Sequence, residues 1–324
     1  RLSDDRLAEI AEEFGLAVSD LEFVGGFENR VYAFRSDGRD LILRIGHDGR
    51  RSELQVRSEL IWLEFLHNGG ASVSAPAAPG GYSNLARIAD GSGGKFISTS
   101  FDRAKGARPE PGTWDDEFFR TYGRALGRIH CLSRQFSRPP AFDRPHWDDE
   151  SELARLKSFL PDGEILVADR LDNVREGIRR LPSDPDRYGM IHQDPHVGNL
   201  MMDHEGGITL FDFDDCVFGH YLYDIAMVFF YAGMSDPEPA ELVGRFIRPF
   251  LSGYREENFI PGDCLEAIPL FMKLREIDLY AVIHRSFDVA TTDDEWVLGF
   301  LNGDERRRRI ENDVPWIDFD WSKY

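Results

Sequence analysis

Residues 192–211 read HQDPHVGNLMMDHEGGITLF and lead directly into Asp212. Two short apolar runs, LMM and ITLF, flank the turn signal DHEGG, and this pattern predicts a β-hairpin. A polar loop enters the hairpin and a carboxylate follows it. We therefore expect three side chains, Asp194, Asn199 and Asp212, to face one cleft.

These three side chains are the set that phosphoryl transfer requires. One carboxylate takes or orients the proton of the acceptor hydroxyl, while a second carboxylate and an amide oxygen hold Mg²⁺ against the nucleotide phosphates. Asp and Asn offer hard oxygen ligands, which suit Mg²⁺ and suit zinc poorly. Asn199 follows Asp194 by five positions, as in the protein-kinase catalytic loop, and Asp212-Phe213 matches the start of the kinase metal-binding loop.

Taken one at a time, these residues would be weak evidence for a phosphotransferase site. An Asp–Asn pair in a loop more often stabilises a turn, and a lone histidine such as His192 is more often a hydrogen-bonded structural residue. The combination of loop, hairpin and carboxylate at this spacing is what indicates a phosphotransferase site.

The rest of the chain divides into two parts of different character. Residues 1–102 are rich in strand patterns, whereas residues 103–324 are mainly helical. We predict an α+β, protein kinase-like, two-lobed fold, with a small β-rich N-terminal lobe at 1–102 and a larger helical C-terminal lobe at 103–324.

Apolar periodicity and turn residues set the expected elements. Residues 71–95 are rich in Gly, Pro, Ala and Ser, and their structure is left open. Strands are expected near 21–23, 31–34, 41–45 and 95–101, a β-like segment at 190–213, and helices at 3–15, 52–67, 114–131, 148–160, 168–181, 221–233, 238–254 and 264–287.

The first part carries nucleotide-binding features in the order that a kinase has them. Gly25 and Gly26 form a turn whose backbone amides can approach phosphate oxygens. Arg44 places a cation at the end of a strand, Glu59 on the next helix is positioned to pair with it, and Phe101 marks the hinge. Taken singly, these residues indicate only a turn, a strand-edge cation and a solvated helix face. Their order favours a nucleotide site.

Residues 192–226 resemble the signature of the aminoglycoside phosphotransferase and choline kinase-like superfamily. The resemblance implies that Asp194 is the catalytic base, that His192 shapes the catalytic loop, and that Asn199 and Asp212 are magnesium ligands. It also implies that Asp224, in an Asp-Ile-Ala helix start, is a buried anchor for the backbone of the catalytic loop.

Two weaker motifs are similar to one branch of that superfamily. FMKLRE at 271–276 and RRRRIEN at 306–312 resemble the stress-response kinases, spore-coat-associated kinases and type II homoserine kinases. Without the resemblance, the arginine run indicates the solvated face of a helix.

Composition limits the partners. With 38 basic against 58 acidic residues the net charge is −20, which disfavours nucleic acids and anionic membranes as partners. No apolar run approaches the ~20 residues of a membrane span. The N-terminus lacks a signal-peptide pattern, and three widely spaced cysteines favour a reducing cytoplasm.

We therefore predict a phosphotransferase that uses ATP or GTP with Mg²⁺ and phosphorylates a hydroxyl of a small molecule, such as an amino alcohol, an aminoglycoside or homoserine. An acidic and aromatic acceptor pocket could attract an amine. A stress-response type Ser/Thr protein kinase and a nucleotide-binding pseudokinase stay open as alternatives, as does the oligomeric state. Candidate lining residues of the acceptor pocket are Asp214, Asp215, Trp147, Tyr221, Glu276 and Asp278.

Overall fold

The computed structural model describes residues 2–262 and 264–324, and contacts group them into two compact units. The first unit comprises the residues up to 108 together with 135–144 and 199–214, and the second comprises 109–134, 145–198 and 215–324. Each unit is therefore built from three separate segments of the chain, whereas the sequence suggested one boundary after residue 102. The functional division into lobes at that residue stays a prediction.

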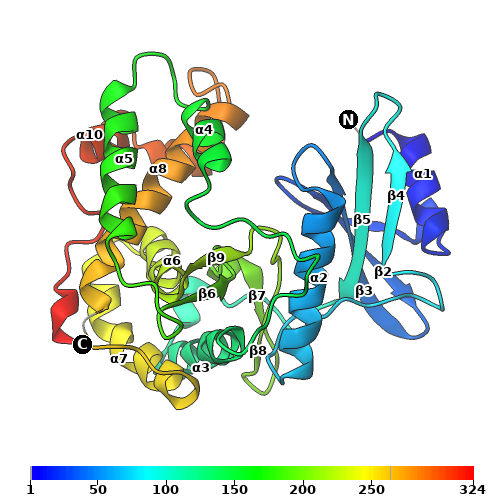
Figure 1. The fold of residues 1–324 in the computed structure, drawn as a ribbon, viewed down its shortest axis with the longest axis horizontal. Coiled ribbons are helices and arrows are strands. Elements are labelled where there is room, and N and C mark those ends of the chain that lie inside the picture. Colours follow the sequence, from blue (N-terminus) through cyan, green and yellow to red (C-terminus); the bar gives the residue numbers. More distant parts are fainter. Residues whose placement is uncertain (1, 263) are drawn as a thin grey trace. The chain divides into compact units, whose positions relative to one another are not determined.

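An antiparallel sheet forms the centre of the first unit, with strand order β1-β2-β3-β5-β4 (Figure 1). Asp37 and Gly38 join β2 to β3 with φ values of 50° and 75°, the conformation that the Asp-Gly signal predicts for a hairpin turn. The strands are β1 (Glu22–Gly25), β2 (Arg30–Ser36), β3 (Arg39–His47), β4 (Leu85–Ala89) and β5 (Lys95–Asp102).

Two helices contact this sheet. Helix α1 (Asp4–Glu13) is capped by the hydroxyl of Ser3 and buries Leu7 and Ile10 against apolar side chains of β2 and β3. Because side chains alternate along a strand, neighbouring β3 residues point to the opposite face. There β3 contacts α2 (Glu53–Asn68), and in Figure 1 α1 lies beside β4 while α2 lies across the sheet from it.

The hairpin predicted around residue 205 is present and completes the first unit. Strands β7 (Leu200–Met202) and β8 (Ile208–Leu210) pair antiparallel, with Leu200 opposite Leu210. The N–H of Ser74 donates to the carbonyl oxygen of Leu210 at 2.9 Å, and that of Ala107 donates to Met202 at 3.0 Å. These bonds tie the hairpin to chain segments that come more than ninety residues earlier.

The second unit is mainly helical, as the sequence predicts. Strands β6 (Tyr188–Ile191) and β9 (Val217–His220) form a small antiparallel sheet. The helices are α3 (Asp116–Ser133), α4 (Glu150–Lys157), α5 (Ile165–Arg179), α6 (Tyr221–Met234), α7 (Pro239–Glu257), α8 (Ile268–Ser286), α9 (Glu295–Leu301) and α10 (Glu305–Glu311). Short 3₁₀ segments lie at η1 (Val18–Asp20), η2 (Pro111–Thr113), η3 (Val197–Asn199), η4 (Leu265–Ala267) and η5 (Trp321–Lys323).

Helices α3 and α7 pack so closely that their backbones nearly touch. A Cβ added to Gly123 of α3 would clash with the carbonyl oxygen of Phe250, and one added to Gly253 of α7 would clash with that of Arg120. Helix α6 is buried almost all round and carries Asp224 among its apolar side chains. A buried carboxylate is costly unless it is hydrogen-bonded. The hydrogen-bond partners of Asp224 lie in the candidate site described below.

The expected mixed α+β class is confirmed, with a sheet in the N-terminal region and a larger helical part. The sequence did not predict β4, β9 or α9, which are short or lie in segments of weak periodicity, whereas the helix indicated by the arginine run is present as α10. Among the described residues, no helix is both long enough and apolar enough to cross a membrane.

Candidate functional site

Arg44 on β3 and Glu59 on α2 form a buried, two-armed ion pair. The Nη1–Oε1 and Nη2–Oε2 distances are 2.8 and 2.7 Å, and the two side chains are 8% and 0% exposed. The Arg44 guanidinium carbon lies 5.0 Å from the ring centre of Phe101 on β5. The pairing expected from the sequence is therefore confirmed, and Phe101 belongs to the same cluster.

The turn at Gly25 and Gly26 has a backbone that only glycine adopts readily, with φ values of 139° and 122°. A Cβ on Gly26 would clash with the carbonyl oxygen of Asn29. Around the position of a Cβ on Gly25, no atom of the described residues lies within 4 Å. The backbone of this turn is thus open to a ligand's close approach, as a turn over phosphates must be.

Asn199 and Asp212 lie at the same end of the β7–β8 hairpin. Phe211, the neighbour of Asp212, donates its backbone N–H to the carbonyl oxygen of Asn199 at 3.0 Å. Asp212 has a left-handed φ of 64°, its side chain is 49% exposed, and its Oδ1 lies 3.9 Å from Nη1 of Arg44. A strained backbone under an exposed carboxylate is typical of a functional position.

A magnesium site built on these two residues fits their chemistry. The described residues contain no group of three or more His, Cys, Asp and Glu side chains arranged to hold a metal ion. Mg²⁺ does not need such a group, because it retains waters and takes further oxygens from the phosphates of a bound nucleotide. One carboxylate at Asp212 and one amide oxygen at Asn199 are sufficient protein ligands for that mode.

Asp214, two residues further on, is held by several cations of the first unit. Its carboxylate accepts a hydrogen bond from Asn29 Nδ2 at 3.0 Å and pairs with Arg50, while its carbonyl oxygen accepts from Arg144 Nη2 at 2.6 Å and Arg51 Nε at 3.3 Å. Asp214 is 5% exposed. It was expected to line the acceptor pocket, which stays a prediction; the structure shows that its carboxylate contacts this arginine cluster.

A small hollow with a cavity volume of about 10 Å³, room for about one water molecule, adjoins the arginine cluster. Three arginines and Asn29 contribute polar groups to it, while Ile97 and Val56 contribute apolar surface.

In the second unit, the loop that carries Asp194 is fixed by the buried carboxylate of Asp224. The backbone N–H groups of His192 and Gln193 donate to it at 2.9 and 2.7 Å, and His130 Nε2 lies 3.0 Å from it. Gln193 has a φ of 73°, which is unusual for a residue with a side chain. The anchoring role implied for Asp224 by the family resemblance is confirmed.

His192 is fully buried, and its Nδ1 lies 3.4 Å from the backbone N–H of Asp194, which donates to it. The ring therefore braces the turn of the loop from inside. This placement agrees with a loop-shaping residue rather than with a group that contacts substrate.

The carboxylate of Asp194 contacts an arginine, with a side chain 12% exposed, that the sequence did not single out. Arg275 Nη2 donates to Asp194 Oδ1 at 2.6 Å, and His196 Nε2 lies 3.5 Å from Asp194 Oδ2. Arg275 also donates from Nη1 to Asp278 at 2.8 Å and from Nε to the Tyr231 hydroxyl at 2.8 Å.

Burial shifts the pKa values of the groups around this arginine. It raises the pKa of the Asp278 carboxyl, against the opposing effect of Arg275, and it raises that of the Tyr231 hydroxyl well above its ordinary value. For Arg275, burial favours loss of the proton, but the Asp194 carboxylate and its neighbours outweigh burial and raise the pKa. A permanent positive charge therefore lies between two carboxyl groups.

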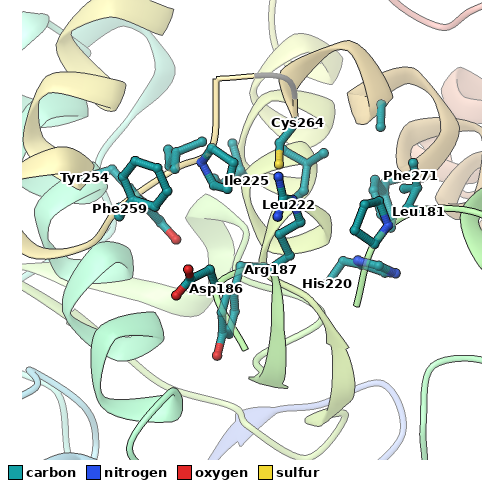
Figure 2. A pocket seen from close by; sticks show the side chains of 15 residues that line it. Leu181, Asp186, Arg187, His220, Leu222, Ile225, Tyr254, Phe259, Cys264 and Phe271 are labelled. Carbon is teal, nitrogen blue, oxygen red and sulfur yellow. The ribbon is translucent and has the colours of Figure 1, made fainter. Parts of the chain in front are cut away.

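A second hollow lies in the helical unit, lined mainly by apolar side chains (Figure 2). Leu222 and Ile225 of α6 project into it beside Cys264 and Phe271, with Asp186 and Arg187 at one side. Tyr221, an expected acceptor-pocket residue, lines it too, but none of the predicted catalytic, nucleotide-binding or metal-binding residues does.

Glu276 and the arginine run are also placed differently from expectation. Glu276 is 1% exposed, and its Oε1 accepts from Arg306 and Arg309 of α10 at 2.6 and 3.0 Å. Glu276 was expected to line the acceptor pocket, and in the structure its carboxylate is occupied by these two arginines. Arg306 is 3% exposed, so the arginine run is not merely a solvated helix face.

Each unit thus gathers its own set of predicted residues. The second unit contains Asp194 and His192, while the others belong to the first unit: Gly25, Gly26, Arg44, Glu59, Phe101, Asn199 and Asp212. That these sets meet in one cleft stays a prediction. The sequence missed Arg275 because its contact with Asp194 spans 81 positions, and only the FMKLRE motif drew attention to that helix.

Comparison with known proteins decides the family. A model of the family described as "Phosphotransferase enzyme family" (APH) matches residues 20–260, most of the chain. The chain belongs to this family. It is a kinase, an enzyme that transfers a phosphoryl group to a hydroxyl of a small molecule.

Two curated relatives of this family member illustrate the extent of the match. It is similar to the amicoumacin kinase of Bacillus subtilis (strain 168), with 34% identity over 98% of this chain and 94% of that protein. An uncharacterized protein of Synechocystis sp. is 30% identical over 91% of this chain and 79% of its own length.

Solved structures of the family agree with this fold. An amicoumacin kinase in complex with AMP-PNP, Ca²⁺ and Ami superposes with a TM-score of 0.90 at 28% identity, covering 99% of this chain and 97% of that one. A microcompartment-associated aminopropanol kinase gives a TM-score of 0.69 at 24% identity, over 90% and 93% of the two chains. The latter likeness concerns the fold alone.

Proposed function

We propose that this kinase transfers the γ-phosphoryl group of ATP to a hydroxyl of amicoumacin or of a closely related small molecule, with Mg²⁺ as the divalent ion. The observation that carries the proposal is the 34% identity to an amicoumacin kinase over nearly the full length of both chains. A related kinase structure that contains AMP-PNP and Ca²⁺ supports a nucleotide and a divalent ion in the reaction.

In this proposal Asp194 is the catalytic base. The acceptor oxygen bonds to the γ-phosphorus, and its proton passes to the Asp194 carboxylate. The bond between the γ-phosphorus and the oxygen that bridges the β- and γ-phosphates breaks, and ADP leaves with the electrons of that bond. His192 and Asp224 keep the loop that carries Asp194 in shape.

The first unit supplies the nucleotide-binding groups. Arg44, held rigid by Glu59, offers two N–H groups to phosphate oxygens in a fixed plane. The Gly25-Gly26 turn offers backbone amides, and Phe101 flanks the arginine. Asn199 and Asp212 would hold the divalent ion, which would supply positive charge to neutralise the phosphates.

Neither a nucleic acid nor a membrane is proposed as a partner, in keeping with the net charge of −20. A cytoplasmic location stays a prediction. ATP is proposed ahead of GTP because the related complex contains an ATP analogue.

The proposal is tested by a coupled ADP-release assay with ATP and Mg²⁺ across amicoumacin, amino alcohols, aminoglycosides, homoserine and a generic Ser/Thr peptide. Mass spectrometry of the acceptor then checks for the gain of one phosphoryl group. Amicoumacin should show the highest kcat/KM. If another small molecule is turned over and amicoumacin is inert, the acceptor assignment fails, while peptide phosphorylation would instead favour a protein kinase.

The role of Asp194 has its own test. Asp194→Asn removes the proton acceptor with little change in shape, and we expect turnover to fall by at least ~100-fold, the lower range of general-base contributions. Nucleotide binding, measured by calorimetry, should survive. Near wild-type turnover in this variant would remove Asp194 as the base.

A further inference from the structure

We propose that Arg275 is a positioning residue that holds the carboxylate of Asp194 in its reactive orientation. The inference rests on the proposed role of Asp194 and adds a residue for which neither the motif nor the comparisons assign a part in the reaction. It starts from the 2.6 Å hydrogen bond between Arg275 Nη2 and Asp194 Oδ1.

The arginine is itself fixed from several directions. Nε and Nη2 donate to the Tyr231 hydroxyl on α6 at 2.8 and 2.5 Å, and Nη1 donates to Asp278, one turn further along α8, at 2.8 Å. Its guanidinium lies 5.4 Å from the ring centre of Tyr231, and the side chain is 12% exposed. A planar fork with these acceptors has one orientation, and a lysine ammonium could not serve them together.

The helix beneath Arg275 is also held in place. Glu276, its neighbour on α8, is 1% exposed and bound by Arg306 and Arg309. The guanidinium of Arg306 lies 4.3 Å from the ring centres of both Phe300 and Trp316. The backbone position from which Arg275 projects is therefore fixed by contacts that do not involve Asp194.

Asp194 consequently has two different restraints. Its backbone belongs to the loop that Asp224 anchors, while its side chain is oriented by Arg275 through Oδ1. A proton acceptor must lie within hydrogen-bond reach of the hydroxyl in the correct direction, and small misplacements are costly. The backbone anchor does not itself fix the rotation of the carboxylate. Arg275 contacts Oδ1 at 2.6 Å and His196 lies 3.5 Å from Oδ2, so Arg275 makes the shorter of these two contacts.

The test compares Arg275→Gln and Arg275→Lys with Lys273→Gln. The last is a matched control, because it removes another cation–carboxylate contact of α8, the one with Asp313, without touching Asp194 or Glu276. Turnover is measured with amicoumacin as acceptor and, in parallel, as ADP release without an acceptor, where water receives the phosphoryl group.

We expect Arg275→Gln to lower kcat by about 100-fold, as misplaced catalytic groups do, while the KM for ATP stays within about twofold of the wild-type value. Arg275→Lys should recover only part of the loss, and Lys273→Gln should keep the wild-type kcat. Guanidinium at a non-denaturing concentration should partly restore Arg275→Ala, relative to sodium chloride of equal ionic strength.

The double variant Asp194→Asn/Arg275→Gln separates positioning from a structural role. If Arg275 acts through Asp194, the double variant should be no slower than Asp194→Asn alone. Additive losses, a parallel rise in the KM for ATP, or a kcat unchanged in Arg275→Gln would each overturn the inference. A nearly active Asp194→Asn would instead overturn the proposed base, so the two failures are distinguishable.

Discussion

Arg44 without its guanidinium would leave Glu59 as a buried carboxylate with no exposed surface. Removing one partner of a buried pair costs about 3–5 kcal/mol, because the remaining charge stays desolvated. We expect Arg44→Ala to lose stability of that order in urea unfolding and to raise the KM for nucleotide.

Arg39→Ala is the matched control for this prediction. Arg39 pairs with Asp102 on the same sheet, but the side chains are 48% and 44% exposed. Exposed pairs contribute about 0–1 kcal/mol, so this variant should unfold nearly like the wild type and bind nucleotide normally. Equal losses of unfolding free energy in Arg44→Ala and Arg39→Ala would contradict the larger stability contribution expected of the buried pair.

Individual residue pairs show which contacts could be predicted from the sequence. Arg44 and Glu59 lie 15 positions apart on adjacent elements, so strand and helix patterns alone could pair them. Asp214 and Arg275 have partners much further along the chain, at 163 positions for Arg51 and 81 for Asp194. Such contacts depend on the tertiary fold, and no local pattern predicts them.

At the scale of elements, the α3–α7 crossing sets a sharp steric limit. An alanine at Gly253 would place its Cβ against the carbonyl oxygen of Arg120, which is backbone and cannot rotate away. We expect Gly253→Ala to destabilise the protein by at least ~1–3 kcal/mol, the usual cost of overpacking, measured as a lower urea midpoint.

Gly244, on the same helix α7, provides the control. Among the described residues, the one atom within 4 Å of its added Cβ would be Phe319 Cε2, at 3.6 Å, which is an ordinary contact. Alanine is favoured over glycine inside a helix by about 1 kcal/mol, so Gly244→Ala should raise stability slightly. If both variants lost stability, the expected gain from helix propensity at Gly244 would be wrong. The clash expected from the close crossing at Gly253 does not depend on that gain.

The junction of β9 and α6 makes stability depend on pH. Burial among Trp147, Tyr188 and Phe271 lowers the pKa of His220 to about 4, against an ordinary value of 6.5. Between these values the unfolded chain binds a proton that the folded chain does not, so stability falls as pH decreases from about 6.5 towards 4.

His220→Phe keeps the ring but removes this proton. The slope of unfolding free energy between pH 7 and 5 should be smaller than in the wild type, by up to ~1.4 kcal/mol per pH unit. His204→Gln, at a side chain 91% exposed, should leave the slope unchanged. Identical slopes for the wild type and His220→Phe would show that His220 is not the group that titrates.

For the whole molecule, ligand binding should appear as a change in thermal stability. ATP with Mg²⁺ should raise the Tm, since a ligand at a hundredfold excess over its Kd contributes about 2.7 kcal/mol. ATP alone should give a smaller shift, and Asp212→Ala should abolish the difference. GTP in the same series tests nucleotide preference, and a Tm unaffected by any nucleotide would contradict the nucleotide site.

The whole-molecule scale also separates what sequence could predict from what it could not. The β7–β8 hairpin and most helices follow from periodicity and turn residues. Residues 71–95 gave no such signal, and β4 appears there because it pairs with β5 at the edge of the sheet. The lining of the acceptor pocket stays a prediction, and the ion pairs of Glu276 and Asp214 inside their units were not predicted, because their partners lie far away in the sequence.

The first unit combines segments that lie far apart in the sequence, and this affects its folding during synthesis. A ribosome releases residues 1–108 first, yet the hairpin and Asp214 that complete this unit come with residues 199–214. The arginines that hold Asp214 therefore lack this carboxylate until synthesis has reached about two-thirds of the chain. Biogenesis of the nucleotide-side unit is consequently a late event, and a nascent chain stalled earlier would expose an incomplete unit to chaperones and proteases.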